Sequence, residues 1–202
     1  GIVGAQTALA AGMGWAIRYR AEARVAMCFM GDAAVNQGAL HESLNMAAIW
    51  RLPVIYVVEN NEYGMGTAFH RISATVIKDR SGAYGIPATV VDGQDALATW
   101  RHFEALAEQV RNGGGPRFVE VKTYRFRGHS MSDPVSGTYR SKEEVTERTE
   151  QSDPIKILRD RMFAAELLTQ EALEAVDREV RAQVDEAAEF ADRAPLPDPG
   201  EL

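Results

Sequence analysis

Residues 24–61 constrain the fold most, because two apolar runs in this stretch are separated by one helical pattern. The first run, residues 24–30, is followed by Asp32, and the second, residues 53–58, is followed by Asn61. Between the two runs, apolar residues recur at the helical period. Strand, tight turn, helix and strand in this order predict one βαβ unit of a parallel sheet.

Asp32 and Asn61 each come shortly after one of the two predicted strands. Because parallel strands joined by a right-handed crossover end at the same edge of a sheet, we expect these two side chains to lie side by side. A carboxylate oxygen, an amide oxygen and a nearby backbone carbonyl suit Mg²⁺, which takes its other ligands from phosphates and water. The helix expected to begin at about Ala34 would aim free N–H groups at the same place. The unit therefore predicts a magnesium diphosphate site.

The other elements follow from periodicity and capping residues. We expect a small-residue helix in residues 1–20, a polar surface loop in residues 70–88, and an aperiodic functional loop in residues 124–140. Capping patterns begin helices at Asp95, Ser141, Asp153 and Thr169. Further strands are predicted at residues 89–91 and 117–122.

Composition and charge exclude several classes of partner. The 202 residues, 46% of them hydrophobic, suffice for one sizeable α/β core. The net charge is −7, so nucleic acid and anionic membranes would be repelled. No apolar stretch reaches the roughly 18 residues of a membrane helix, and no signal peptide is visible. The single cysteine, Cys28, lies in an apolar run, which predicts a buried thiol, no disulfide and a reducing compartment.

Five segments together resemble a known family. Gly31-Asp32 and, after a spacer, Asn60-Asn61 are similar to the thiamine diphosphate motif. The flanking segments are GIVGAQ at the start, NQGALHESLNMAA in the helix, ENNEYGMGT after the second run, and TYRFRGHSMSDP downstream. They resemble alpha chains of the thiamine diphosphate-dependent 2-oxoacid dehydrogenase family, in particular those of the pyruvate dehydrogenase type. The resemblance extends from Gly1 to about Ala194.

The resemblance implies a fold and a set of site residues. The fold is α/β, a thiamine diphosphate-binding fold with a mostly parallel sheet flanked by helices in residues 1–140, and a C-terminal helical extension in residues 141–202. The implied cofactor-binding residues are Gly1, Val3, Gly31, Asp32, Ala33, Ala34, Asn61 and His129. The implied Mg²⁺ ligands are Asp32, Asn61 and the backbone carbonyl of Tyr63. Gln37 is implied in the substrate pocket, and His129 as the catalytic residue.

Several of these residues have a simpler explanation. Gly1 and Val3 could serve tight helix packing alone, and Gln37 could satisfy the first turn of a helix. A lone histidine such as His129 is more often an exposed surface residue without a catalytic role. At Ala33 the family usually has Gly, so the added Cβ is expected to disfavour a positive φ and to weaken cofactor binding if the turn requires that conformation.

The implied activity is oxidative decarboxylation of pyruvate, with acetyl transfer to a lipoyl group. The implied partners are a beta subunit in an α2β2 tetramer, which supplies the carboxylate for the cofactor's pyrimidine ring, and the lipoyl domain of the dihydrolipoyl acetyltransferase core. The implied location is the bacterial cytoplasm or, alternatively, the mitochondrial matrix. Because relatives carry a segment before Gly1, we expect an N-terminal part to be missing.

Other functions remain open from sequence alone. Acetoin or branched-chain 2-oxoacid dehydrogenase alpha chains are the nearest alternatives, and a non-catalytic assembly subunit is another. A generic nucleotide-binding domain would carry G-x-G-x-x-G after the first strand, and this chain does not. Ser130 and Ser136 occupy positions that eukaryotic relatives phosphorylate, and the sequence leaves their modification open.

Overall fold

The computed structural model describes residues 2–201, and its chain divides into two compact units. The first unit extends to Leu158 and the second begins at Arg159. The domain boundary predicted after residue 140 falls inside the first unit. The division of the chain into a cofactor-binding part, residues 1–140, and a helical extension, residues 141–202, stays a prediction. Among the described residues, no helix combines the length and apolar character needed to cross a membrane.

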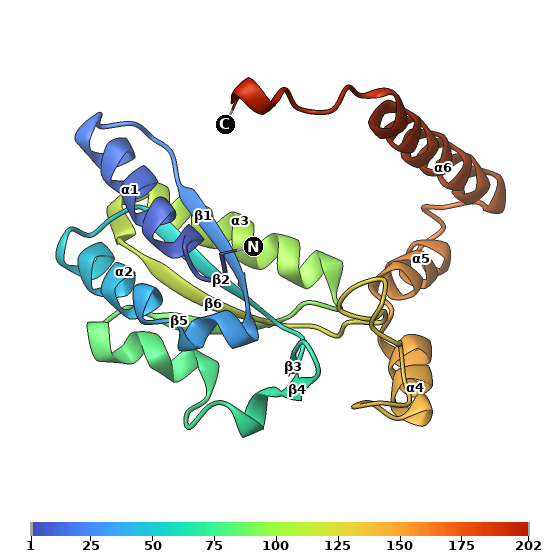
Figure 1. The fold of residues 1–202 in the computed structure, drawn as a ribbon, viewed down its shortest axis with the longest axis horizontal. Coiled ribbons are helices and arrows are strands. Elements are labelled where there is room, and N and C mark those ends of the chain that lie inside the picture. Colours follow the sequence, from blue (N-terminus) through green and yellow to red (C-terminus); the bar gives the residue numbers. More distant parts are fainter. Residues whose placement is uncertain (1, 202) are drawn as a thin grey trace. The chain divides into compact units, whose positions relative to one another are not determined.

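A four-stranded parallel sheet forms the centre of the first unit (Figure 1). Its strands, in spatial order, are β1 (Ala26–Gly31), β2 (Val54–Asn60), β6 (Arg117–Lys122) and β5 (Ala88–Asp92). The short strands β3 (Tyr63–Gly64) and β4 (Thr67–Ala68) form a separate antiparallel hairpin. The predicted βαβ unit and the mostly parallel sheet are confirmed.

Helices cover both faces of this sheet. One face carries α1 (Gln6–Tyr19), α2 (Gly38–Ile49) and the 3₁₀ segment η3 (Ile77–Tyr84), and the other carries α3 (Ala96–Gln109). Residues 54–58 of β2 are buried without a break, which is typical of a parallel strand covered on both sides. This burial explains why their sequence, VIYVV, has no polar alternation.

The remaining segments are short turns and the C-terminal helices. The turns are η1 (Asp32–Asn36), η2 (Phe69–Arg71), the π-type turn η4 (Val110–Gly114) and η5 (Pro199–Glu201). The helices are α4 (Lys142–Ser152), α5 (Pro154–Ala164) and α6 (Gln170–Arg193). Asp95, Ser141 and Thr169 are N-caps whose side chains accept backbone N–H groups, as predicted. The polar surface loop predicted over residues 70–88 is mostly exposed, but it contains the 3₁₀ segment η3, whose Ile77 is buried in the core.

The C-terminal helical tail is confirmed by α6, in which no residue is buried. Ion pairs four residues apart join Asp177 to Arg181 and Glu189 to Arg193. Such exposed pairs support a helix only weakly, by about 0.3–0.5 kcal/mol each. The helix nevertheless leaves Val176, Val180 and Val184 exposed on one side.

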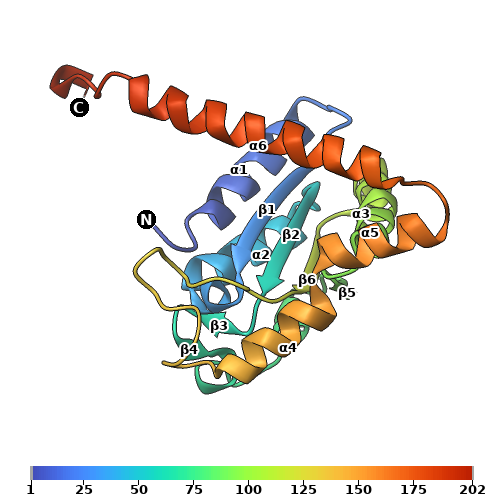
Figure 2. The ribbon, with the colours of Figure 1, turned by 90° about the vertical axis from the view of Figure 1, so that its right-hand side faces the viewer.

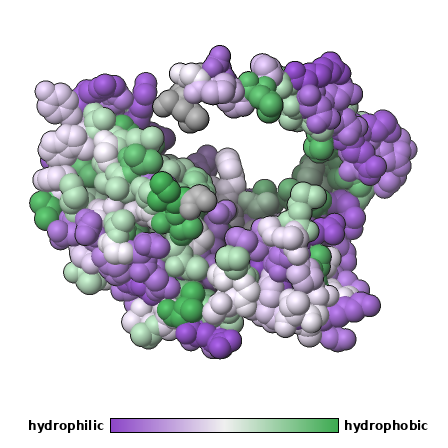
Figure 3. All heavy atoms as spheres, viewed as in Figure 1, coloured by the Kyte–Doolittle hydropathy of each residue, from purple (hydrophilic) through white to green (hydrophobic). Residues whose placement is uncertain are grey.

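Apolar side chains are also exposed over α1 and α2. They include Leu9, Met13 and Trp15 of α1 and Met46 of α2, and green apolar atoms gather over this part of the molecule in Figure 3. The rings of Trp15 and Trp50 lie 4.7 Å apart, centroid to centroid. A surface with this many large apolar groups is suited to a protein interface.

Cys28 has the environment expected for a buried thiol. Its side chain lies in β1 among the core residues that face α1 and α2. Burial raises the pKa of the Cys28 thiol to about 11, because the thiolate would lose its hydration there.

Candidate functional site

Two turns lie beside each other where β1 and β2 end. The strands are parallel neighbours, with Gly31 opposite Glu59 at their carboxyl ends. Asp32 therefore follows one strand and Asn61 the next, as the sequence predicts. Figure 2 shows η1 and the β3–β4 hairpin together at the arrowhead ends of these two strands. We refer to residues 32–36 as the first turn and to residues 60–63 as the second turn.

The first turn differs from the predicted helix start. Residues 32–36 form a 3₁₀ turn, Gln37 is extended with φ −73° and ψ 134°, and α2 begins only at Gly38. The prediction of a helix from about Ala34 was therefore wrong. Ala34 lies inside the 3₁₀ turn, and its carbonyl accepts the N–H of Gln37 at 3.1 Å.

Arg80 of η3 holds the first turn from outside. Its guanidinium donates to the carbonyl of Val35 at 3.1 Å, to Oδ1 of Asn36 at 2.7 Å and to Oγ of Ser73 at 2.7 Å. Because the extended Gln37 interrupts the helix, the Val35 carbonyl lacks the partner that a continuous helix would give it. Arg80 supplies that hydrogen bond instead. Arg80 escaped the sequence analysis because nothing local links it to residues 32–36.

Asp32 is almost fully buried, with 1% of its surface exposed. Its Oδ2 atom is buried and has no hydrogen-bond partner. Burial raises the pKa of the Asp32 carboxyl group, while backbone N–H groups and the charge of Arg125 act in the opposite direction. A buried acceptor without a partner is costly, and a bound cation would satisfy it. This atom therefore fits a Mg²⁺ ligand.

Ala33 is accommodated without strain. It is not among the described residues with positive φ, so the turn does not require that conformation and the conditional penalty does not apply; weaker cofactor binding through the added Cβ stays a prediction. A Cβ built on Gly64 would lie 2.6 Å from the Cβ of Ala33. The missing side chain at Gly64 is what makes room for the methyl group at Ala33. Beside Gly31, by contrast, a Cβ would meet open space.

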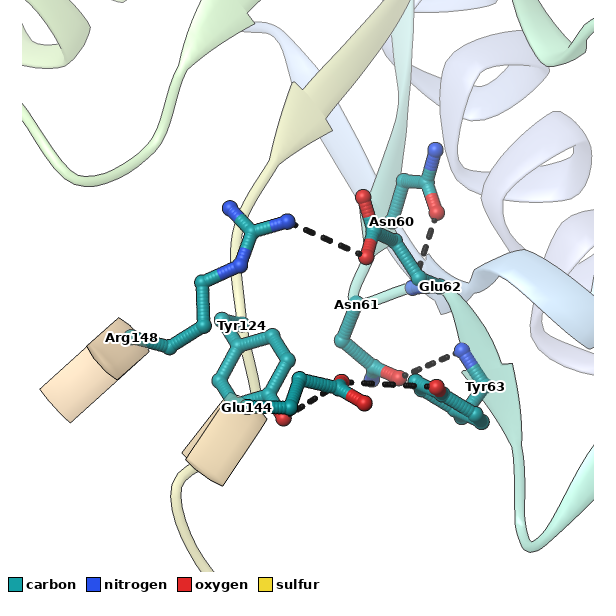
Figure 4. A network of polar contacts seen from close by, with 7 residues as sticks. All are labelled: Asn60, Asn61, Glu62, Tyr63, Tyr124, Glu144 and Arg148. Carbon is teal, nitrogen blue, oxygen red and sulfur yellow. Dashed lines mark hydrogen bonds and ion pairs between the residues drawn. The ribbon is translucent and has the colours of Figure 1, made fainter. Parts of the chain in front are cut away.

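The second turn is held by its own asparagines (Figure 4). Oδ1 of Asn60 accepts the N–H of Glu62 at 3.0 Å, and Oδ1 of Asn61 accepts the N–H of Tyr63 at 3.2 Å. Nδ2 of Asn60 donates to Glu120 at 2.8 Å, so this side chain is committed to the sheet. An amide oxygen has two lone pairs, which leaves one on Asn61 for a further partner.

Glu62 has an unusual backbone conformation, with φ +72°. This conformation costs a residue with a side chain on the order of 1 kcal/mol and persists only where surrounding contacts impose it. The Glu62 carbonyl accepts the N–H of Phe69 at 2.8 Å, and its carboxylate lies 3.6 Å from Arg148 of α4. The Glu62 side chain is thus paired with α4.

Tyr63 contacts two later parts of the chain. Its hydroxyl donates to Oε1 of Glu144 on α4 at 3.4 Å. Its carbonyl, the implied third metal ligand, accepts Nη1 of Arg125 at 3.5 Å, and Arg125 also donates to Met65 O at 2.7 Å. At 3.5 Å the Tyr63 bond is weak, and a carbonyl oxygen has a second lone pair that a cation could use.

Arg140 organises the loop of residues 124–140. It is buried and donates to the carbonyls of Arg125, Arg127 and Val135. Its guanidinium also lies over the rings of Tyr63, Tyr124 and Tyr139, 5.2 to 5.8 Å from their centroids. The sequence predicted a functional loop over residues 124–140 with His129 in it, but Arg140, which folds that loop, was missed.

His129 is exposed in this loop. Its backbone N–H donates to Oδ2 of Asp133 at 2.7 Å, and the same carboxylate oxygen accepts the hydroxyl of Tyr139 at 2.6 Å. These hydrogen bonds hold the pKa of the Asp133 carboxyl below its usual value. Within the described residues, no hydrogen bond joins His129 to Asp32 or Asn61. Hydrogen bonds of the described residues therefore order the loop around His129 without joining its side chain to Asp32 or Asn61.

The N-terminal turn lies against Gln37. Gly4 has φ +90°, and a Cβ there would lie 2.8 Å from Cγ of Gln37. Only glycine permits both this conformation and this approach. Val3 precedes α1 and is exposed, whereas Gly1 lies outside the described residues. The structure thus brings residues 3 and 4 to the same edge as Gln37.

The donors at this edge are oxygen atoms of different kinds. Within the described part of the chain, no group of three or more His, Cys, Asp or Glu side chains could hold a metal ion. A cation here would depend on one carboxylate, that of Asp32, together with amide and backbone oxygens. Mg²⁺ accepts such mixed oxygen sets and keeps open positions for phosphate and water.

Comparison with known proteins gives a consistent result. The family model described as dehydrogenase E1 component matches residues 1–200. The chain is 47% identical to the pyruvate dehydrogenase E1 component subunit alpha of Zymomonas mobilis, covering 100% of this chain and 56% of that protein. The Rhizobium meliloti subunit of the same name is 46% identical, with 100% and 58% covered. The somatic mitochondrial form of Homo sapiens is 44% identical, with 100% and 51% covered. The chain thus spans about half the length of the curated relatives it matches.

Proposed function

The chain belongs to the dehydrogenase E1 component family, and from that premise we propose that it acts within the alpha subunit of a pyruvate dehydrogenase. The proposed reaction is thiamine diphosphate-dependent oxidative decarboxylation of pyruvate with acetyl transfer to a lipoyl group. The observation that carries the proposal is the buried, unpartnered Oδ2 of Asp32 at the end of β1, beside the turn that contains Asn61. The names of the relatives support pyruvate as the substrate.

Each implied site residue has a proposed role. Asp32, Asn61 and the carbonyl of Tyr63 hold Mg²⁺. Gly31, Ala33 and Ala34 offer backbone groups to the diphosphate, where the open space beside Gly31 permits close approach. Gly1 and Val3 contact the aminopyrimidine ring, and Gln37 contacts the substrate. His129 binds the cofactor and donates a proton in acyl transfer.

The chemistry divides between the cofactor and this chain. Thiamine diphosphate, when bound, supplies the electron sink that makes loss of CO₂ from a 2-oxoacid possible. Asp32 contributes an ionised carboxylate in a site sheltered from water, where attraction to a cation is strong. Burial alone opposes ionisation of Asp32, so cation binding and ionisation favour each other. Exposure of His129 leaves its imidazole accessible to an incoming lipoyl group.

The proposed partners follow from what the chain lacks and exposes. A beta subunit in an α2β2 tetramer would supply the carboxylate that binds the pyrimidine ring, and the exposed apolar side chains over α1 and α2 suit such a contact. The acetyl acceptor would be the lipoyl domain of a dihydrolipoyl acetyltransferase core. The proposed location is the bacterial cytoplasm, with the mitochondrial matrix as the alternative; a buried reduced Cys28 is compatible with both.

The test uses the complete protein purified with its partner subunit. Reduction of an artificial electron acceptor is measured with pyruvate, acetoin or a branched-chain 2-oxoacid, with thiamine diphosphate and either Mg²⁺ or a chelator. The proposal predicts Mg²⁺-dependent turnover that is fastest with pyruvate. Faster turnover of acetoin or a branched-chain acid would reassign the substrate. Absence of Mg²⁺-dependent thiamine diphosphate binding would instead favour a non-catalytic assembly subunit.

A further inference from the structure

The helix α4 begins with the sequence pattern of a capping box, but only one of the two capping hydrogen bonds of that motif is formed. The Ser141 side chain accepts the N–H of Glu144 at 3.0 Å, as an N-cap residue should. In a complete capping box, the carboxylate of the fourth residue returns to the backbone N–H of the N-cap. Here the Glu144 carboxylate accepts two tyrosine hydroxyls instead, from Tyr124 at 2.8 Å and Tyr63 at 3.4 Å. The carboxylate therefore joins α4 to other parts of the fold.

One turn further along α4, Arg148 reaches the same segment. Its guanidinium lies 3.6 Å from the carboxylate of Glu62 and 5.5 Å from the ring centroid of Tyr124. Residues four apart on a helix share one face, so α4 presents Glu144 and Arg148 together. Figure 4 shows both side chains pointing at consecutive residues of the second turn, Glu62 and Tyr63.

These contacts restrict the Tyr63 backbone. Its N–H is held by Asn61, its hydroxyl meets Glu144, and its ring lies 5.5 Å from that of Tyr139, centroid to centroid. The preceding residue, Glu62, is kept at φ +72°. Together with the 3.5 Å hydrogen bond from Arg125 to the carbonyl itself, these contacts limit how far the Tyr63 carbonyl can turn.

We propose that Glu144 is a positioning residue for the second turn, holding the Tyr63 side chain so that the Tyr63 carbonyl is aimed at the cation site. The inference rests on the proposed function, in which that carbonyl is a Mg²⁺ ligand. Glu144 itself does not touch the cation. Its effect passes through one hydroxyl group, which can be removed by Tyr63→Phe without altering the carbonyl.

The test measures Mg²⁺ binding in the complete protein with its partner subunit, by calorimetric titration at a fixed thiamine diphosphate concentration. Tyr63→Phe and Glu144→Ala are each expected to raise the apparent Mg²⁺ dissociation constant about tenfold, which is the size of effect seen when a metal ligand loses its supporting group. Both substitutions remove the same contact. The double variant should therefore bind Mg²⁺ no more weakly than the single variant that has the lower affinity. Glu144→Gln, which keeps an acceptor oxygen, should fall between Glu144→Ala and the wild type.

Tyr124→Phe is the matched control, because Tyr124 donates to the same carboxylate without belonging to the second turn. It should lower the melting temperature but leave Mg²⁺ affinity within about twofold of the wild type. The inference is overturned if Tyr63→Phe and Glu144→Ala bind Mg²⁺ like the wild type, or if Tyr124→Phe weakens binding as much as Tyr63→Phe. A wild-type protein that binds no Mg²⁺ overturns the proposed function and the inference with it, whereas normal wild-type binding with unaffected variants overturns only the inference.

Discussion

The first and second turns end neighbouring strands of one sheet, yet they are stabilised in different ways. The first turn buries Asp32 and has no described residue with positive φ. The second turn is partly exposed and contains Glu62 at φ +72°. Arg80 braces the first turn with hydrogen bonds, whereas Glu144 and Arg148 contact the second from α4. The local sequence thus places the chemical groups of both turns, while distant side chains fix their conformation.

The largest expected effect comes from removing the carboxylate of the first turn. Asp32→Ala should weaken Mg²⁺-dependent thiamine diphosphate binding by more than about 100-fold, because a ligand is lost rather than a supporting group. Calorimetric titration of the complete protein measures this effect. Asp79→Ala removes the same charge from an exposed position on η3 and should leave binding intact. An equal loss in both variants would mean that overall charge, not Asp32, controls affinity.

Replacing the two bracing arginines compares the turns directly. Arg80→Met should lower the free energy of unfolding by about 2 to 3 kcal/mol, because it leaves the buried Val35 carbonyl without its partner. Arg148→Met should cost less than about 1 kcal/mol, because its ion pair with Glu62 is about half exposed and 3.6 Å long. Urea denaturation measures both values. A larger loss for Arg148→Met would reverse the assignment of which turn depends on burial.

Ala33 and Gly64 test whether the first turn packs against the residue that directly follows the second turn. Gly64→Ala should destabilise the fold by about 2 kcal/mol, because the new Cβ would lie 2.6 Å from that of Ala33. Ala33→Gly alone should cost about 0.5 to 1 kcal/mol through the backbone entropy of glycine. Thermal or urea unfolding of the double variant should recover most of the loss caused by Gly64→Ala. If the two losses simply add, Ala33 and Gly64 are not in contact in solution.

The smallest expected effect is a pH dependence of stability without metal. Burial raises the folded-state pKa of Asp32 above its ordinary value, so the folded state retains a proton that the unfolded state has lost. Stability from this group therefore falls as pH rises through the folded-state pKa. Asp32→Asn should remove that fall, and its stability relative to the wild type should grow as pH rises from the ordinary carboxyl pKa of about 4 to the higher folded-state pKa. A constant difference across this range would show that Asp32 titrates as it does in the unfolded chain.

The sequence predicted the elements whose signals are local. The apolar runs gave β1, β2 and β6, and the caps at Asp95, Ser141 and Thr169 gave the starts of three helices. The adjacency of Asp32 and Asn61 followed from parallel strand order alone. Their roles as ligands stay predictions that the binding measurements above would test.

The errors and omissions share a physical cause. The helix expected from Ala34 is interrupted because Gln37 is extended and Arg80, more than forty residues later, satisfies the Val35 carbonyl. The conditional penalty at Ala33 does not apply because its φ is not positive, and Gly64, thirty-one residues later, makes room for its methyl group. Arg140 was missed because its three carbonyl partners come together only in the folded loop. Each depends on contacts that a linear pattern does not contain.

The buried thiol of Cys28 makes the chain convenient for site-specific labelling. It is the single cysteine in these 202 residues, and with a pKa of about 11 it is almost entirely protonated near neutral pH, where only thiolates react quickly. A maleimide dye would therefore modify an exposed cysteine introduced by Ser130→Cys much faster than Cys28. The fluorescence of that dye would follow the loop around His129 without first removing the native cysteine.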